Sequence, residues 1–190
     1  MPDILDRALT FAIEAHQGMT RKDTDIPYIV HPAEAVTICA TLTTDREVLA
    51  AAALHDIVED TPYTIEDVEE MFGERVAHIV AGCSEDKREE KPATDTWKIR
   101  KNETIEHLMS IDDVDIKMVS LSDKLSNLRS LYRDVVTLGD EVWSRFNQAD
   151  PKEHAWYYTS ICDVLARDFR ETFAWQELHS LIEATFSRYR

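Results

Sequence analysis

The stretch LHDIVEDT ends a long apolar run with a group of ionisable side chains. Seven apolar residues, Val48–Leu54, lead directly into His55, Asp56, Glu59 and Asp60. In a continuous helix of about 100° per residue, His55 and Glu59 would share one face. Asp56 and Asp60 would share the adjacent face, so all four groups would crowd one turn. Carboxylates so close together repel one another, and removing even one from water is costly.

A divalent cation would resolve this conflict. Its charge would compensate the acidic groups, and imidazole and carboxylate together are a common ligand set. The alternative is a solvated helix end whose acidic side chains only face water. The Ala-rich run before the motif favours a buried site, and so do two further segments of the chain.

The first of these segments supplies a second imidazole, and the other a further carboxylate. His31 follows the loop RKDTDIPYIV and precedes Pro32, a residue that suits the first turn of a helix. Asp123 lies beside the apolar stripe of the helix VDIKMVSLSDKLSNLRSL, and Asn127 follows it by four residues on a neighbouring face. Taken alone, a single His is more often structural, and the Asp could be a surface residue.

Together these segments form a known pattern. The order H…HD…D resembles that of the HD-domain metal-dependent phosphohydrolases. More specifically, RKDTDIPYIVHP, AAALHDIVEDT, FGERVAHIVAGCSEDK and SLSDKLSNLRSL resemble the hydrolase domain of the RelA/SpoT family, from about residue 5 to 170. The chain has no room for the synthetase and regulatory domains of the long members, so the resemblance implies a small stand-alone alarmone hydrolase.

The resemblance also implies roles for single residues. The metal ligands would be His31, His55, Asp56 and Asp123, and the family metal is usually manganese. Water activation would fall to Glu59 and Asp60. Substrate contacts would come from Arg21, Lys22, Asn127, Arg100 and Lys101, while Tyr28 would shape the pocket wall.

The reaction implied is metal-dependent hydrolysis of guanosine 3′,5′-bis(diphosphate), ppGpp, or of pppGpp, to GDP or GTP and pyrophosphate. Two alternatives stay open: an HD phosphohydrolase for another nucleotide, such as NADPH, an adenosine alarmone or a nucleoside monophosphate, and a nucleotide-sensing module without catalysis. Two positions depart from the family pattern. Ser122 stands where the family often has Ala, and Ser126 where a larger residue is common.

Helical periodicity predicts an all-α fold. The resemblance implies an HD-type helical bundle, with one domain over residues 1–190. Asp45 is placed to cap the helix that carries LHDIVEDT, and Pro62 to end it. Thr64 with Asp67 resembles a capping box for the following helix. The charged segment 84–96 is expected to be a loop. Further helices are expected at about residues 3–17, 32–43, 97–109, 113–131, 152–171 and 175–188.

Composition limits the partners. With 37 acidic and 21 basic residues the net charge is −16, which disfavours binding to nucleic acid. The three cysteines lie outside any CxxC spacing and are expected to be reduced. No apolar run is long enough to span a membrane, and the N-terminus lacks a signal peptide, so we expect a cytoplasmic protein. The expected partner is a small nucleotide, and a homo-oligomer is left open.

Overall fold

The described part of the chain is helical, as the sequence predicts. The computed structural model describes residues 3–86, 88 and 90–189. Among these residues the only extended pairing is an isolated antiparallel bridge between Thr20 and Pro27. The α-helices are α1 (Ile4–Ala15), α2 (Val30–Cys39), α3 (Arg46–Leu54), α4 (Ile57–Asp60), α5 (Ile65–Phe72), α6 (Glu74–Cys83), α7 (Ala93–Ser110), α8 (Val114–Leu138), α9 (Pro151–Phe169) and α10 (Phe173–Phe186), with 3-10 helices η1 (Gly139–Arg145) and η2 (Ser187–Tyr189).

The helices group into two units. Unit 1 comprises Met1–Ser84 and Asp113–Ser126, and unit 2 comprises Glu85–Asp112 and Asn127–Arg190. Helix α8 contributes its first part to unit 1 and the remainder to unit 2. That the chain forms a single domain over residues 1–190 stays a prediction.

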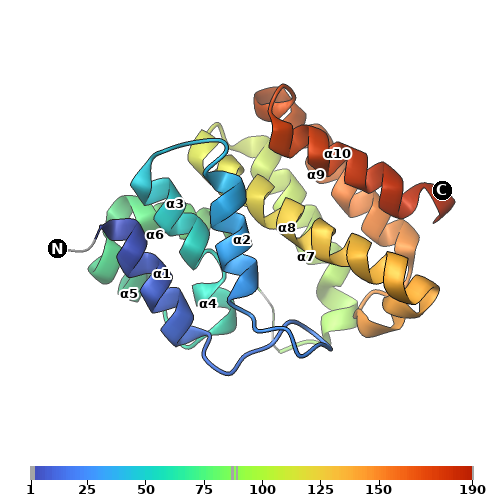
Figure 1. Ribbon diagram of the computed structural model, residues 1–190, viewed down its shortest axis with the longest axis horizontal. Coiled ribbons are helices and arrows are strands. Elements are labelled where there is room, and N and C mark those ends of the chain that lie inside the picture. Colours follow the sequence, from blue (N-terminus) through green and yellow to red (C-terminus); the bar gives the residue numbers. More distant parts are fainter. Residues whose placement is uncertain (1–2, 87, 89, 190) are drawn as a thin grey trace. The chain divides into compact units, whose positions relative to one another are not determined.

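Helix α3 is the centre of unit 1. Helices α1, α2 and α6 all pack against it, and Figure 1 shows α1 and α2 on either side of it. All its residues from Val48 to Leu54 are buried, and all of them except Leu49 have no exposed surface. Methyl side chains let neighbouring helices approach closely, so this run can be surrounded on several sides without leaving cavities. The Ala-rich sequence is therefore the reason that the following motif starts inside the protein.

The motif LHDIVEDT does not form one continuous helix with the apolar run before it. The sequence prediction of a single helix through this motif was therefore wrong. Helix α3 ends at Leu54 and α4 begins only at Ile57, so His55 and Asp56 lie in a turn between them. A hydrogen bond joins His55 Nδ1 to the carbonyl oxygen of Ala52, at 2.8 Å. Two neighbouring residues on a helix diverge by about 100°. Because His55 and Asp56 lie in the turn, their side chains can point to the same place instead of diverging.

The predicted helix starts are largely confirmed. The Asp45 carboxylate accepts a hydrogen bond from the backbone N–H of Glu47, and Thr64 forms a capping box with Asp67. Pro92 precedes the first turn of α7, which begins at Ala93. The expected loop 84–96 was therefore wrong for its last four positions, where Ala93, Thr94, Asp95 and Thr96 are helical.

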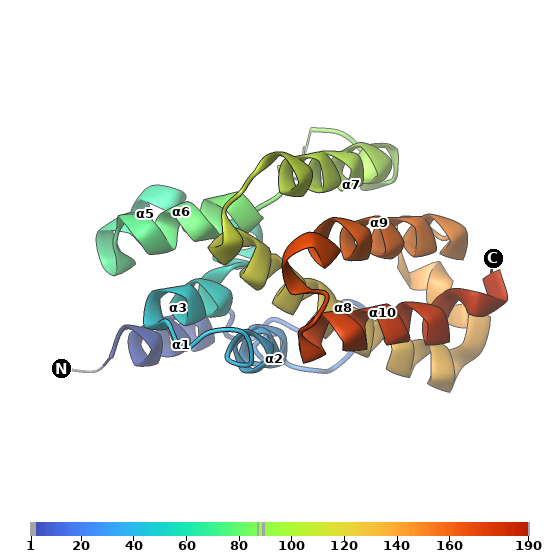
Figure 2. The ribbon, with the colours of Figure 1, turned by 90° about the horizontal axis from the view of Figure 1, so that it is seen from above.

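In unit 2, helix α9 lies between α7 and α10 (Figure 2). His154, near the start of α9, is buried against the rings of Trp97, Trp143 and Phe146, whose centroids are 5.1–5.3 Å from its own. Its Nε2 donates a hydrogen bond to the carbonyl oxygen of Gln148 at 2.8 Å. Burial among aromatic rings disfavours the charged imidazolium and lowers the pKa of His154.

This lowered pKa predicts acid-sensitive stability. In the unfolded chain His154 has an ordinary pKa of about 6.5, so below that value the unfolded state binds a proton that the folded state resists. The stability is present above pH ~6.5 and is lost as pH falls through the lowered folded pKa. We expect the free energy of unfolding, measured with urea at pH 7.5 and 5.5, to fall less in His154→Gln than in the wild type. His107→Gln, a change at an exposed histidine of α7, serves as the control and should follow the wild type. Equal losses in all three proteins would contradict this role of His154.

Candidate metal centre

The loop between α1 and α2 folds back on itself and positions the ring of Tyr28. The backbone N–H of Arg21 donates to the carbonyl of Ile26, and that of Tyr28 to the carbonyl of Met19. Asp23 takes a left-handed φ of 54° at the turn, a conformation that Asp adopts more readily than most residues. The Tyr28 ring stacks on His16, with the centroids 4.9 Å apart.

Two buried histidines direct their Nε2 atoms at each other. His31, in the first turn of α2, and His55, in the turn after α3, are each 3% exposed, and their Nε2 atoms are 3.1 Å apart. The Nδ1 of His55 faces a carbonyl oxygen, which can only accept, so this nitrogen carries the proton. The Nδ1 of His31 lies 2.9 Å from the hydroxyl of Ser126, which donates its own proton to Glu34, so this nitrogen also carries the proton. In the neutral rings, both Nε2 atoms therefore present lone pairs to the space between them.

Two carboxylates complete the group. Asp56 Oδ2 lies 3.3 Å from His31 Nε2 and 3.2 Å from His55 Nε2. Asp123 Oδ1, from α8, lies 3.2 Å and 3.7 Å from the same two atoms. The second oxygen of Asp123 is 2.5 Å from the ammonium group of Lys124. The sequence predicted these four residues from three separate segments, and the structure brings all four together.

The charges around this group favour a cation. Burial opposes a charge on His55, yet the carboxylates of Asp56 and Asp123 raise its pKa well above the usual value. Burial also opposes ionisation of the two acids. Nevertheless the pKa of Asp56 is well below normal because His55 and His31 are close, and that of Asp123 because Lys124 and both histidines are close. The group is stable only when positive charge accompanies its carboxylates.

The donor atoms fit a divalent metal. The selected atoms of His31, His55 and Asp123 all lie within 4.8 Å of one another, and all three residues are buried. Ligands about 2.1 Å from one ion and at right angles to each other are about 3.0 Å apart, close to most of the spacings around the two Nε2 atoms. Imidazole nitrogen with carboxylate oxygen suits several transition metals, manganese and zinc among them. A divalent metal site at this buried group is consistent with its chemistry.

Tyr28 joins this group to α4. Its hydroxyl lies 2.7 Å from Asp56 Oδ2 and 2.5 Å from Asp60 Oδ2. Burial and the two carboxylates raise the pKa of Tyr28, so the phenol keeps its single proton and donates it to one of the two carboxylates at a time. The guanidinium of Arg21 lies 5.5 Å from the centroid of the same ring. Tyr28 therefore does more than form a wall, the only role that the sequence suggested for it.

The remaining predicted site residues lie in different surroundings. Glu59 is half-buried on α4, one residue before Asp60, and Lys22 is exposed next to Arg21. Asn127, Arg100 and Lys101 belong to unit 2. There Arg100 and Lys101 both contact the carboxylate of Glu85, at 3.2 Å and 2.8 Å.

Sequence reasoning missed three residues around the ligands. Ser126 contacts His31 and also donates a hydrogen bond to Glu34, and Lys124 pairs with Asp123. The only available signal was the unusual serine at position 126, which had been noted as a departure from the family. A serine leaves room for a hydrogen-bonded neighbour, but nothing in the sequence identified Glu34 as that neighbour.

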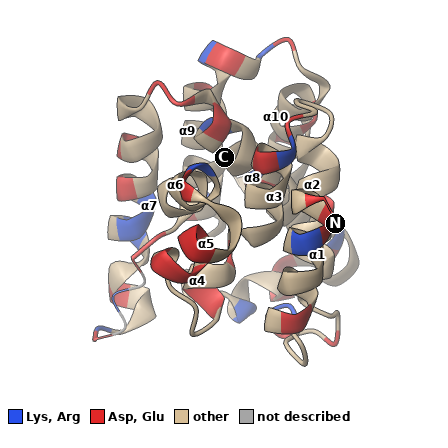
Figure 3. Ribbon diagram, turned by 90° about the vertical axis from the view of Figure 1, so that its left-hand side faces the viewer, with Lys and Arg blue, Asp and Glu red and all other residues tan. Residues whose placement is uncertain are grey.

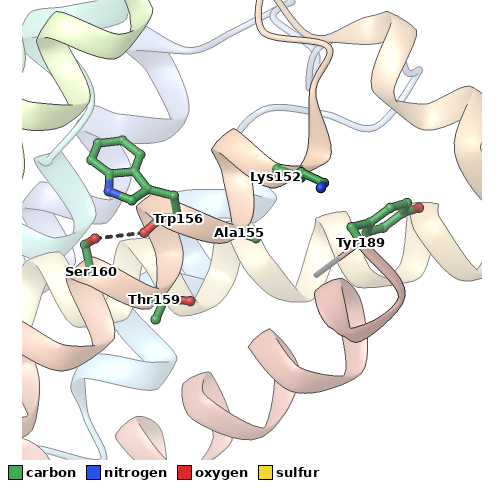
Figure 4. Close-up of a pocket in the computed structure, with 6 residues that line it drawn as sticks. All are labelled: Lys152, Ala155, Trp156, Thr159, Ser160 and Tyr189. Carbon is green, nitrogen blue, oxygen red and sulfur yellow. Dashed lines mark hydrogen bonds between the residues drawn. The ribbon is translucent and has the colours of Figure 1, made fainter.

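A separate cavity lies in unit 2, along α9 and η2. Its volume is about 320 Å³, and Figure 4 shows the side chains that line it: Lys152, Ala155, Trp156, Thr159, Ser160 and Tyr189. The hydroxyl of Ser160 donates to the carbonyl oxygen of Trp156 within α9, so it is satisfied by its own helix. No residue that the sequence assigned to catalysis lines this cavity.

Acidic residues are frequent on two helices of unit 1. Figure 3 shows Asp and Glu residues on α4 and α5, both in unit 1. The acidic residues of α5 are Glu66, Asp67, Glu69 and Glu70. Helices of the length and hydrophobicity required to cross a bilayer are absent from the described residues.

Comparison with known proteins supports the geometry. The family model described as "HD domain" matches residues 8–151. The guanosine-3′,5′-bis(diphosphate) 3′-pyrophosphohydrolase MESH1 of Danio rerio is 40% identical over 133 residues, which is 68% of this chain and 70% of that protein. The bifunctional (p)ppGpp synthase/hydrolase SpoT of Escherichia coli is 36% identical over 128 residues. The match covers 67% of this chain but only 18% of the Escherichia coli protein.

Solved structures agree with this relationship. A structure described as that of a metazoan SpoT orthologue that hydrolyses ppGpp matches with a TM-score of 0.73 and 30% identity, over 99% of this chain and 97% of that one. A protein from Listeria monocytogenes matches with a TM-score of 0.72 and 30% identity, over 83% of this chain and 99% of that one. The predicted all-helical HD fold is thereby confirmed. The chain belongs to the HD-domain family, and its HD domain is of the SpoT and MESH1 type.

Proposed function

We propose that this protein is a metal-dependent pyrophosphohydrolase that removes the 3′-diphosphate of ppGpp or pppGpp. The observation that carries the proposal is the convergence of His31, His55, Asp56 and Asp123 in an HD domain related to ppGpp hydrolases. The products would be GDP or GTP and pyrophosphate. The physiological setting proposed is the cytoplasm, and self-association stays open.

The four convergent residues would hold the metal, with manganese the proposed ion. A divalent metal in such a site polarises a phosphoryl oxygen and favours deprotonation of the attacking water. The chain prepares for this by engaging both Nδ1 atoms with acceptors, so that the Nε2 atoms are the ones directed at the metal position, and by engaging the outer oxygen of Asp123 with Lys124.

Glu59 is the proposed general base. Water attacks the phosphorus attached to the ribose 3′ oxygen, and Glu59 accepts a proton from that water. The new P–O bond replaces the P–O3′ bond, the 3′ oxygen takes up a proton, and pyrophosphate leaves. Asp60 is already engaged by the Tyr28 hydroxyl, so we assign it to positioning the water, while half-buried Glu59 performs the proton transfer.

Basic residues would bind the nucleotide, which is strongly anionic. Arg21 and Lys22 lie on the loop that ends at Tyr28, and Arg21 is held over the Tyr28 ring. Arg100 and Lys101 are proposed to neutralise charge on the leaving pyrophosphate, and Asn127 to contact the sugar or phosphate. In a chain of net charge −16, such local positive groups must help to attract the substrate.

The substrate class is tested by turnover with manganese across a panel of ppGpp, pppGpp, pppApp and NADPH. We expect release of pyrophosphate from the guanosine compounds with the highest kcat/KM. A preference for pppApp or NADPH would replace the guanosine assignment with that of another HD phosphohydrolase. Tight nucleotide binding without turnover would instead favour a sensing module.

Loss of one ligand should release the metal. We expect Asp123→Ala to lose both metal content, measured by elemental analysis after gel filtration, and activity, because a buried carboxylate oxygen facing both histidines disappears. Asp115→Ala is the matched control on the same helix, since Asp115 pairs with Arg75 instead. Full metal content in Asp123→Ala would contradict the assignment of this ligand.

Glu59→Gln separates proton transfer from metal binding. The amide keeps the size of the side chain but cannot act as a base, so kcat should fall by roughly 10²–10⁴-fold, the usual contribution of general acid–base catalysis. Metal content and melting temperature should be retained because the four proposed ligands are intact. Glu69→Gln, at an exposed glutamate of α5, should leave kcat unchanged. An active, metal-loaded Glu59→Gln protein would transfer the proposed role to Asp60.

A further inference from the structure

The hydroxyl of Ser126 joins two side chains of α2. It donates a hydrogen bond to Glu34 Oε2 at 2.8 Å, and it lies 2.9 Å from His31 Nδ1. A carboxylate can only accept, so the hydroxyl proton points to Glu34. The lone pairs of the same oxygen are then available to His31, whose Nδ1 must be the donor. The direction of both hydrogen bonds follows from this single assignment.

We propose that Glu34 and Ser126 are positioning residues that fix the tautomer of His31 and strengthen its binding of a divalent metal. This inference rests on the metal site of the proposed function. Neither residue contacts the space between the imidazoles, so both act through the ring. Hydrogen-bonded partners of a metal-ligating imidazole orient the ring and raise its basicity, and their loss typically lowers metal affinity or activity about 10–100-fold.

The fold places the three side chains so that they form one chain of hydrogen bonds. His31 and Glu34 are three residues apart on α2, and residues at this spacing lie on the same helix face. Ser126 comes from α8 and is 2% exposed, so water has little access to the hydroxyl. Glu34 therefore acts on the His31 ring through the hydrogen bonds of the neutral Ser126 hydroxyl rather than by direct contact.

The two imidazoles are held by different means. The backbone carbonyl of Ala52 fixes the ring of His55, and no side-chain substitution can remove this carbonyl. Two side chains fix His31. The affinity for the metal should therefore depend on the residues at positions 34 and 126, whereas the orientation of His55 is set by the course of the chain.

The test measures the Mn²⁺ dissociation constant by competition with a fluorescent chelator. The proteins are the wild type, Ser126→Ala, Glu34→Gln, the double variant and Ser126→Thr, which keeps the hydroxyl. Ser122→Ala is the matched control, because Ser122 lies on the same helix, is fully buried, and donates to the carbonyl of Met118 instead. Melting curves of the metal-free proteins report folding separately.

We expect Ser126→Ala to weaken Mn²⁺ binding about 10–100-fold, with Ser126→Thr and Ser122→Ala close to the wild type. Glu34→Gln should weaken binding less, and the double variant should be no weaker than Ser126→Ala, since Glu34 acts through the hydroxyl. An unchanged affinity in Ser126→Ala would overturn the inference, and so would equal effects of Glu34→Gln with and without Ser126. If the wild type failed to bind Mn²⁺, or if an added His55→Ala variant bound it as tightly as the wild type, the proposed metal site itself would be wrong.

Discussion

The arrangement of side chains at the centre of unit 1 depends on the approach of two imidazole nitrogens to 3.1 Å, both with lone pairs facing inward in the neutral state. Two carboxylates are directed at the same atoms. Groups that can only accept do not attract one another, so the arrangement requires a cation, either protons or a metal ion. The surrounding structure holds these acceptors together against their mutual repulsion.

Several neighbouring polar groups serve this purpose by engaging the outer atoms of the ligands. Lys124 pairs with the outer oxygen of Asp123, whereas the Tyr28 hydroxyl lies 2.7 Å from Asp56 Oδ2, the oxygen that also faces the histidines. The Nδ1 atoms of the histidines are engaged by a carbonyl and a hydroxyl. His31, His55 and Asp123 are thus each oriented from behind, and each leaves one atom facing its partners. An arrangement of this kind is preorganised, and its geometry would change little when an ion binds.

Helix caps could be predicted from the sequence because they depend on local residue types, whereas the grouping of His31 and Asp123 with the HD pair was predicted only from the resemblance of the whole pattern to a known family. Asp45 and Thr64 are residue types that favour the helix N-cap, and both accept hydrogen bonds from the backbone there. The break after Leu54 could not be predicted, because the apolar run gives no signal of where a helix ends. The break falls where His55 and Asp56 turn toward the same group of ligand atoms. Contacts between distant segments, such as Ser126 with Glu34, were equally hidden, since neither residue has a distinctive pattern.

The four consecutive alanines of α3 have an evolutionary consequence. These alanines have no functional groups. However, three helices pack around α3, and His55 directly follows the apolar run that contains them. A larger side chain at any of these positions would have to push a neighbouring helix away, and that displacement would reach the ligands directly. Selection on the reaction should therefore preserve small residues at positions 50–53, so invariance there would reflect the demands of packing rather than participation in catalysis.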